Sequence, residues 1–272
     1  MPTALPLSTS NRSPIDVARE CAAQAATIVR GVWGQDHAVG SKGPRNPVTE
    51  TDVAVERAVR DILQREYPAH LLMGEETSSD AWSDDWMWVV DPIDGTRNFS
   101  RGIPHIGFNL ALCLGGEPVV GLTTHPLTGD EFLAVQGLGT TLNGRQVRVN
   151  GDAPLSETIL ALDLGLEDVA AQAQLRTANA LWQRVLGVRI GASAALGLAY
   201  LAAGKWDAYI HVILAPWDSA PGLLLVREAG GVVTELDGSP ATLRSTAVVA
   251  GTPANHAAIL DEAQRQHLAS AR

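Results

Sequence analysis

The sequence predicts an α+β fold whose two halves differ in their patterns of apolar residues. Two helical patterns come first, short apolar runs punctuated by Gly, Pro and Asp follow, and strand and helix patterns alternate after about residue 155. Short punctuated runs favour an antiparallel sheet, whereas alternation of strand and helix is typical of an α/β unit. We expect a loose tail at 1–12, an N-terminal α+β half at 13–155 and a C-terminal α/β half at 156–272.

The first half begins with two helices that carry clear boundary signals. Ser13 and Pro14 form an N-cap followed by a proline at the first helical position, so a helix should start there and run to about Trp33. A second amphipathic helix is predicted over 51–67, because its apolar residues recur on one stripe and Pro68 follows it. The Gly-rich segment 34–47 between them predicts a break in regular structure.

The remaining elements follow from runs of β-branched and apolar residues. In the first half, strands are predicted at 71–73, 86–90, 106–114, 119–124 and 131–135. In the second half, strands are predicted at 159–162, 188–190 and 207–211, and around Val232 and Ala247. Helices are predicted near 168–182, in the Ala-rich segment after 190, and at 217–229.

Composition narrows the class of protein. With 272 residues, 46% of them hydrophobic and 18% charged, the chain can bury a full core. Its formal charge of −10 disfavours binding to nucleic acid or to an anionic membrane. Cys21 and Cys113 are far apart in sequence, so we expect two buried thiols rather than a disulfide framework. No window is long and apolar enough to span a membrane and no signal-peptide pattern opens the chain, so we expect a cytoplasmic protein.

Acidic residues occur where regular elements stop or start. Each follows a predicted strand or opens a predicted helix: Glu75, Glu76, Asp91, Asp94 and Asp218. Apolar flanks hold these backbones rigid, so the carboxylates can converge on one point. Hard oxygen ligands without histidine or cysteine suit Mg²⁺, Mn²⁺ or Ca²⁺ better than Zn²⁺. The tight turn at 92–95 can also aim the carbonyl of Ile93 at a metal.

The segment after Asp94 indicates what such a metal is for. Gly95 and Thr96 lead into a stretch that can open a short helix, where backbone N–H groups attract an anion. Metal carboxylates beside an anion site favour phosphoryl chemistry, in which the cation neutralises charge and activates a water molecule. The Thr96 hydroxyl is placed to orient that water.

Three motifs carry a family resemblance: GEE at 74–76, DPIDGTRNF at 91–99 and WDSAPGLLLVREAGG at 217–231. Together they resemble the signatures of the inositol monophosphatase family, and the resemblance spans nearly the whole chain. It implies the layered α-β-α-β-α sandwich of metal-dependent, lithium-sensitive phosphatases, which are often homodimers. It also implies two or three Mg²⁺ ions, for which Mn²⁺ can substitute.

The resemblance assigns roles residue by residue. The implied metal ligands are Glu75, Asp91, the carbonyl of Ile93, Asp94 and Asp218. Thr96 and Asp52 match the pair that positions the attacking water, and Glu75 completes the implied catalytic set. The phosphate and substrate contacts fall on Asp94, Gly95 and Thr96. Glu76 fits a role behind the ligands or at a third metal, and Lys42 corresponds to a basic residue that approaches the phosphate.

The substrate end of the pattern departs from the family. Inositol enzymes carry an acidic residue seven positions before the aspartate of WD, and this chain has His211 there. A neutral imidazole can bond one hydroxyl but cannot replace a bidentate carboxylate. The segment 191–195 resembles the family's G-[S/T]-A segment, which places Ser193 and Ala194 near the substrate ring. Arg97 is either a solvated side chain or a contact for a second phosphate.

These observations support one leading hypothesis and leave alternatives open. The first is Mg²⁺-dependent hydrolysis of a small polyol or sugar phosphate, with inositol monophosphate as the first candidate. Histidinol phosphate, fructose bisphosphate and adenosine 3′,5′-bisphosphate phosphatases share the same metal site. In a different class, the fold serves as a binding or regulatory partner, for example of transcription or ribosome machinery.

Overall fold

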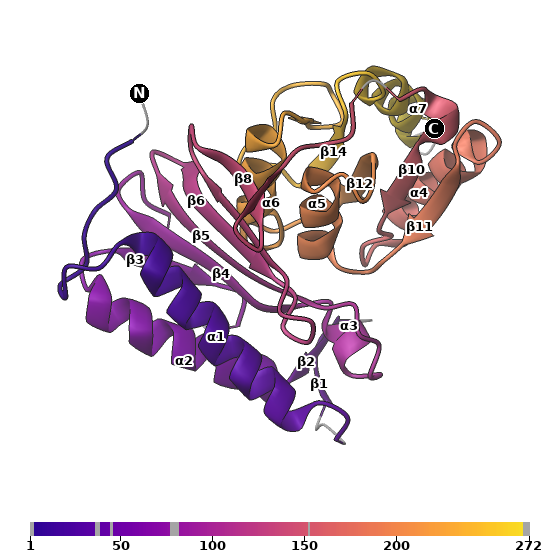
Figure 1. The fold of residues 1–272 in the computed structure, drawn as a ribbon. Helices are drawn as coiled ribbons and strands as arrows, with labels where there is room; N and C mark the ends of the chain where they lie inside the picture. The colour runs from indigo at the N-terminus through magenta and orange to yellow at the C-terminus, as the bar shows by residue number, and fades with distance from the viewer. Residues whose placement is uncertain (1–2, 36–38, 44–45, 77–81, 152, 269–272) are drawn as a thin grey trace.

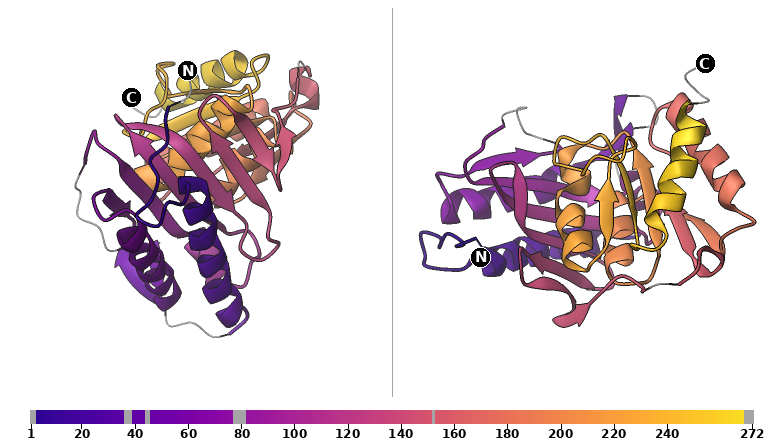
Figure 2. Two further views of the ribbon diagram at one scale, coloured as in Figure 1. Left: turned by 60° about the vertical axis from the view of Figure 1, so that its left-hand side comes forward. Right: turned by 90° about the horizontal axis from the view of Figure 1, so that it is seen from above.

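The fold stacks five layers in the order helix, sheet, helix, sheet, helix (Figure 1). The computed structural model describes residues 3–35, 39–43, 46–76, 82–151 and 153–268. Helices α1 (Pro14–Val32) and α2 (Glu50–Glu66) cover one face of the larger sheet, as the left view of Figure 2 shows. Helices α5 (Ala194–Ala202) and α6 (Pro216–Glu228) lie between the two sheets. Helices α4 (Asp168–Leu181) and α7 (His256–Leu268) cover the outer face of the smaller sheet. The predicted α-β-α-β-α sandwich is confirmed.

The larger sheet has seven strands in sequence order, and every neighbouring pair except β3 and β4 is antiparallel. Its strands are β3 (Leu71–Gly74), β4 (Met87–Asp94), β5 (Gly107–Leu114), β6 (Glu117–Thr124), β7 (Glu131–Val135), β8 (Gly139–Leu142) and β9 (Arg145–Val147). The first five match predicted runs. The prediction missed β8 and β9, which are short and largely polar. Asn143 and Gly144 join them with positive φ angles of 52° and 76°, and this Asn-Gly turn was the available signal.

The smaller sheet has the strand order β11-β10-β12-β14-β13. Its strands are β10 (Ile159–Leu162), β11 (Gly187–Ile190), β12 (Ala208–Val212), β13 (Val232–Thr234) and β14 (Ala247–Gly251). Strand β10 runs parallel to both β11 and β12, whereas β14 runs antiparallel to β12 and β13. All five lie where the sequence predicted them, and the 3₁₀ helix η1 (Leu155–Glu157) leads into the first.

The Gly-rich segment 34–47 is more regular than predicted. It contains β1 (Val39–Gly43) and the first half of β2 (Asn46–Thr49), which form an antiparallel pair. A two-stranded ribbon outside the main sheets needs no apolar face, so hydrophobic periodicity gave no sign of it. Strand β2 ends at Thr49, the N-cap of α2, and thus delivers the chain directly into that helix.

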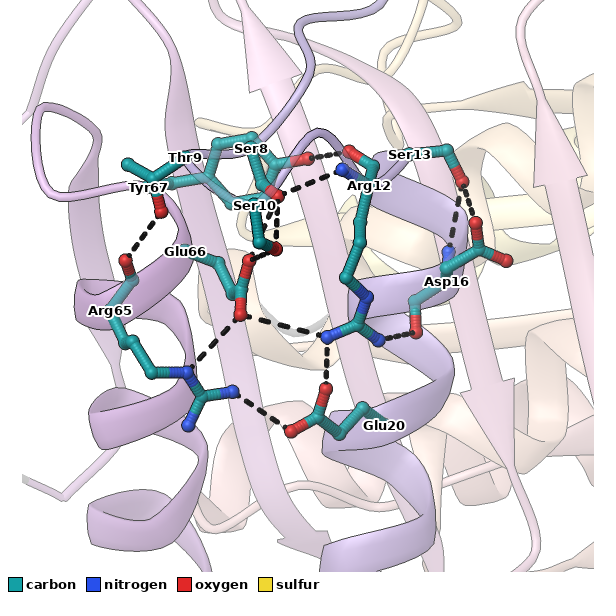
Figure 3. Close-up of polar contacts among 10 residues, drawn as sticks. All are labelled: Ser8, Thr9, Ser10, Arg12, Ser13, Asp16, Glu20, Arg65, Glu66 and Tyr67. Atoms are coloured by element: carbon teal, nitrogen blue, oxygen red, sulfur yellow. Dashed lines mark hydrogen bonds and ion pairs between the residues drawn. The ribbon is translucent and has the colours of Figure 1, made fainter.

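The N-terminal segment also differs from the loose tail we expected, because residues 8–12 are hydrogen bonded to the end of α2 (Figure 3). The hydroxyl groups of Ser10 and Ser8 donate to the buried carboxylate of Glu66. These bonds lower the pKa of Glu66 to about 2. The Arg65 Nε lies 3.2 Å from the same carboxylate and Arg12 lies 3.6 Å from it. The segment therefore closes over the end of α2.

The core has three apolar clusters: one between the outer helices α1 and α2 and the larger sheet, one around α5 and α6 between the two sheets, and one between the smaller sheet and α4 and α7. Cys21 and Cys113 are both buried and free, as predicted. Burial raises the pKa of both thiols, which keeps them protonated. In the part of the chain that the structure describes, no helix combines the length and the hydropathy that a membrane crossing requires.

Candidate functional site

A pocket of about 320 Å³ lies where the end of β4, the short helix α3 (Thr96–Phe99), the turn at 191–194 and the start of α6 meet. Eleven of the residues named from the sequence line it: Glu75, Asp91, Ile93, Asp94, Gly95, Thr96, Arg97, Ser193, Ala194, His211 and Asp218. Residues far apart in the sequence thus meet at one place.

Three aspartates form the centre of the pocket. Each of Asp91, Asp94 and Asp218 offers an oxygen within 4.8 Å of the other two. Burial, with repulsion from neighbouring carboxylates, raises the pKa of Asp91 and Asp218 well above the ordinary range. Burial raises the pKa of Asp94 to about 7. Carboxylates this close can all ionise at neutral pH only if a cation joins them, so the cluster can hold a metal.

A bulge in β4 aims two of these carboxylates at one point. The strand continues through Asp94 rather than ending near Val90, which corrects the predicted boundary. Asp91 pairs with Asn109 and Asp94 pairs with Gly107, so β4 uses one residue more than β5 over this span. In a regular strand, residues three apart face opposite sides, and one extra residue turns them to the same side. Pro92 is tolerated there because a bulge needs fewer backbone donors.

Thr96 and Asp52 meet beside this cluster, as the family resemblance implied. The Thr96 hydroxyl lies 3.1 Å from Asp52 Oδ1 and 3.1 Å from the carbonyl oxygen of Ile93. Asp52 belongs to the first turn of α2, where its other oxygen accepts a bond of 2.8 Å from the backbone N–H of Thr49 in a capping box. Burial raises the pKa of Asp52. The start of α2 therefore fixes the carboxylate that holds Thr96.

Gly95 and Asn98 fasten the start of α3 to the rest of the site. Gly95 has a φ of 90°, and a Cβ there would lie 3.1 Å from the carbonyl oxygens of His105 and Ala192. The Asn98 side-chain amide donates to the carbonyl oxygens of His105 at 2.8 Å and Gly191 at 2.9 Å. A side chain at position 95 would break this close approach, which explains the glycine of the motif.

Lys42 pairs with both glutamates of the GEE motif. Its ammonium lies 2.8 Å from Glu75 and 2.7 Å from Glu76. Burial raises the pKa of Glu76 to about 7. The backbone N–H of Glu76 donates to the buried carboxylate of Glu56 at 2.7 Å. A Cβ on Gly74 would lie 2.5 Å from the Glu56 carboxyl carbon, so the glycine of GEE makes room for that group.

Asp218 is held by its own helix and by the larger sheet. Its Oδ2 accepts a bond of 2.7 Å from the backbone N–H of Ala215, the N-cap of α6. Pro221 has no N–H, so the carbonyl of Trp217 loses its usual helical donor. The side-chain amide of Asn109 on β5 replaces that donor, at 3.1 Å from the carbonyl oxygens of both Trp217 and Asp218.

The turn before α5 reaches Asp94 from the opposite side. The Ser193 hydroxyl and the backbone N–H of Ala195 both donate to Asp94 Oδ2, the latter at 2.7 Å. Ala194 and His211 line the pocket beside this turn. Ala192 in the same turn has a φ of 58°, which L residues other than Asn and Asp seldom adopt.

Comparison with known proteins identifies the family to which the chain belongs. A family model described as the inositol monophosphatase family matches residues 11–268. The chain belongs to the inositol monophosphatase family. It is therefore a member of a family of phosphatases, which are hydrolases that act on small phosphorylated substrates and are generally metal-dependent.

Individual relatives agree with the family match. The chain is 36% identical over 232 residues to a Nus factor SuhB of Pseudomonas aeruginosa, an alignment that covers 83% of this chain and 86% of the relative. It is 34% identical over 244 residues to an inositol monophosphatase 2 of Solanum lycopersicum, covering 87% and 92%. A solved IMPase structure from Thermotoga maritima superposes with a TM-score of 0.88 at 28% identity, covering 94% of this chain and 98% of that one.

Sequence reasoning missed three residues that build this family site. Glu56 lies behind the GEE motif and Asn109 ties α6 to β5. Asp163, just after β10, lines the pocket and accepts bonds from the backbone N–H groups of Gly191 at 3.0 Å, Ala192 and Ser193 at 3.2 Å. The available signal was a polar side chain in or just after an apolar strand, in NLALCL for Asn109 and in ILALD for Asp163.

Proposed function

We propose that this family member hydrolyses a small phosphorylated polyol or sugar with Mg²⁺, and that inositol monophosphate is the first candidate. The observation that carries the proposal is the joint arrangement of two groups. The cluster of Asp91, Asp94 and Asp218 lines the same pocket as Thr96, whose hydroxyl is hydrogen bonded to the buried carboxylate of Asp52. The name of the tomato relative, an inositol monophosphatase, supports the choice of substrate.

The donor set fits Mg²⁺. The groups that would hold it are the carboxylates of Glu75, Asp91, Asp94 and Asp218 and the carbonyl of Ile93, which are all hard oxygen donors. The pocket is large enough for two or three such ions, and Mn²⁺ would substitute because it accepts the same ligands. When bound, such ions would neutralise phosphate charge and lower the pKa of a coordinated water.

The chain's own groups would then set the geometry of attack. Thr96, with its hydroxyl held by Asp52 and by the carbonyl of Ile93, would orient the water through a hydrogen bond. Glu75, which lines the same pocket, would complete this catalytic set. The backbone N–H groups of Gly95 and Thr96 would donate to the phosphate oxygens at the start of α3. Lys42, which pairs with Glu75 and Glu76, would offset part of the negative charge.

Ser193, Ala194 and His211 would contact the rest of the substrate. The His211 imidazole would accept a hydrogen bond from one hydroxyl, at the position where the family's inositol enzymes have a carboxylate. The preference for inositol would therefore be weaker than in those enzymes. Histidinol phosphate, fructose bisphosphate and adenosine 3′,5′-bisphosphate are the alternatives within the class. Glu76 would act behind the ligands or at a third metal.

The test is phosphate release by the purified full chain with Mg²⁺ or with EDTA, on inositol monophosphate and the three alternatives. We expect metal-dependent turnover that is highest for inositol monophosphate. The Asp94→Asn variant should lose it, whereas Asp61→Asn, a matched change on the exposed face of α2, should not. Equal turnover in EDTA, or full activity of Asp94→Asn, would contradict the proposal.

A second candidate function rests on the relative named Nus factor SuhB, which favours a regulatory binding role on the same fold. The Asp94→Asn variant separates the two, because a cellular phenotype that survives loss of hydrolysis supports binding. By family resemblance we further propose that the protein is a cytoplasmic homodimer and that Li⁺ inhibits it. Sedimentation, LiCl titration and cell fractionation test these three points. Within each chain, we propose that residues 13–155 and 156–272 form the two halves.

A further inference from the structure

His211 belongs to a chain of hydrogen bonds that runs through the buried Tyr209 to Asp163, which also lines the pocket. His211 and Tyr209 are two residues apart on β12, so their side chains share one face. The Tyr209 hydroxyl lies 3.1 Å from His211 Nδ1 and donates to Asp163 Oδ2 at 2.7 Å. The Tyr209 ring is fully buried against Gly197, where a Cβ would lie 2.3 Å from it. Gly197 therefore leaves the space that the Tyr209 ring occupies.

The hydrogen bonds along this chain determine which tautomer the His211 imidazole adopts. Asp163 accepts bonds from three backbone N–H groups as well as from Tyr209, so it acts as a carboxylate acceptor. The single proton of the Tyr209 hydroxyl is used on Asp163, which leaves the tyrosine oxygen as an acceptor for His211. The proton of the neutral imidazole must therefore be on Nδ1, and Nε2 carries a lone pair.

The charge state agrees with this tautomer. Burial lowers the pKa of His211, Arg97 on α3 acts in the same direction, and Asp163 on the loop after β10 opposes both. The ring is thus neutral at pH 7.

The other ring nitrogen of His211 lacks a partner. Nε2 is buried and has no hydrogen-bond partner among the residues that the structure describes. Gly165, which lines the pocket with His211, faces it: a Cβ at position 165 would lie 3.9 Å from Nε2. A buried acceptor left unpaired is unfavourable, and a donor from a bound molecule would relieve it.

We propose that Asp163, acting through Tyr209, fixes His211 as a hydrogen-bond acceptor and thereby selects substrates with a hydroxyl group at this point over substrates with a second phosphate. A hydroxyl donates to Nε2, whereas phosphate oxygens at neutral pH are acceptors and leave it unpaired. The inference rests on the proposed phosphatase function and names its substrate class. Asp163 and Tyr209 are positioning residues, and His211 is the specificity residue.

The first experiment reads the tautomer without using activity. The full chain, labelled with ¹⁵N-histidine, is compared by NMR with a His211→Asn sample that identifies the His211 signals. We expect a protonated shift at Nδ1 and an unprotonated shift at Nε2. The Tyr209→Phe variant, which keeps the ring and removes the hydroxyl, should lose this preference. The matched change Tyr200→Phe on α5 should keep it. A proton on Nε2 in the wild type, or unchanged shifts in Tyr209→Phe, would overturn the proposal.

The second experiment measures selectivity. For Tyr209→Phe we expect the KM for inositol 1-phosphate to rise about three- to tenfold, the range of one hydrogen bond, with kcat unchanged. The KM for p-nitrophenyl phosphate, which has no hydroxyl, should not change, and the preference over fructose 1,6-bisphosphate should fall by the same factor. Equal KM changes for all substrates, or none, would refute the selection.

These two readouts separate the inference from the function on which it rests. If no phosphate ester is hydrolysed, the proposed function fails while the NMR shifts still decide the tautomer. Calorimetric titration of inositol 1-phosphate into wild type and Tyr209→Phe then replaces the KM comparison. Equal affinities for the two proteins would overturn the selection.

Discussion

The bond between Asn109 and the opening turn of α6 gives a prediction with a defined magnitude. Replacing Asn109 with Ala removes two hydrogen bonds to backbone carbonyls and one from the buried Thr123 hydroxyl, at about 1 kcal/mol each. It also leaves the carbonyl of Trp217 without a donor, because Pro221 has no N–H, and a buried unpaired group costs about 1–3 kcal/mol. We expect Asn109→Ala to lower the free energy of unfolding by about 4–6 kcal/mol.

The physical reason can be isolated with a double-mutant cycle. In a Pro221→Ala background, the N–H of residue 221 can donate to the carbonyl of Trp217, four residues earlier. The cost of Asn109→Ala should then fall by about 1–2 kcal/mol, which is the coupling energy of the pair. Urea unfolding with EDTA present measures each variant. Asn255→Ala, a buried asparagine change elsewhere, should cost the same in both backgrounds. An equal cost of Asn109→Ala in both backgrounds would refute the reasoning.

Three further predictions test the site and the N-terminal segment. Thr96→Val removes the water-orienting hydroxyl but no proposed metal ligand, so it should lower kcat about 100-fold while Mg²⁺ still raises Tm. A kcat within about threefold of wild type would contradict this prediction. Mg²⁺ at 100 times its Kd should stabilise the protein by about 2.7 kcal/mol, seen as a higher Tm by calorimetry, and Asp94→Asn should abolish the shift. The pKa of Glu66 is lowered from its ordinary value of 4.5 to about 2 in the folded protein. Its carboxylate therefore stabilises the fold fully at pH values above 4.5, and this stabilisation is lost as the pH falls toward 2. The Tm gap between wild type and Glu66→Gln should therefore be widest at pH 5–7 and shrink below pH 4; a gap that is constant with pH would contradict the assignment.

The sequence was sufficient for features that local patterns determine. Ser13 and Pro14 predicted the start of α1, and the apolar runs predicted the central strands of both sheets. The five acidic positions were recognised because charged residues next to buried strands need a reason to be there. Four of them, Glu75, Asp91, Asp94 and Asp218, line one pocket, as expected for carboxylates held by rigid flanks, whereas Glu76 pairs with Lys42 and does not line it.

What the sequence could not provide are partners set by the tertiary fold. Pro221 lies 112 positions after Asn109 (221 − 109). The residues around Asn109 therefore give no sign that this proline leaves the carbonyl of Trp217 free to accept a bond from Asn109. Asp163 binds backbone groups about 30 residues away, and these become its neighbours only when β10 and β11 pair. The β1 and β2 strands have only five and four residues, too few for apolar periodicity to reveal them.

The three aspartates of the cluster also leave the ribosome at different times. Asp91 and Asp94 are made with the first sheet, whereas Asp218 follows 124 residues after Asp94, from 218 − 94. At 5–20 residues per second, that interval is about 6–25 s. During it the early carboxylates are exposed to cations without the last ligand, and β12 and α6 have yet to form. Tight metal binding can therefore begin only late in biosynthesis, and it would mark the moment at which both sheets have come together.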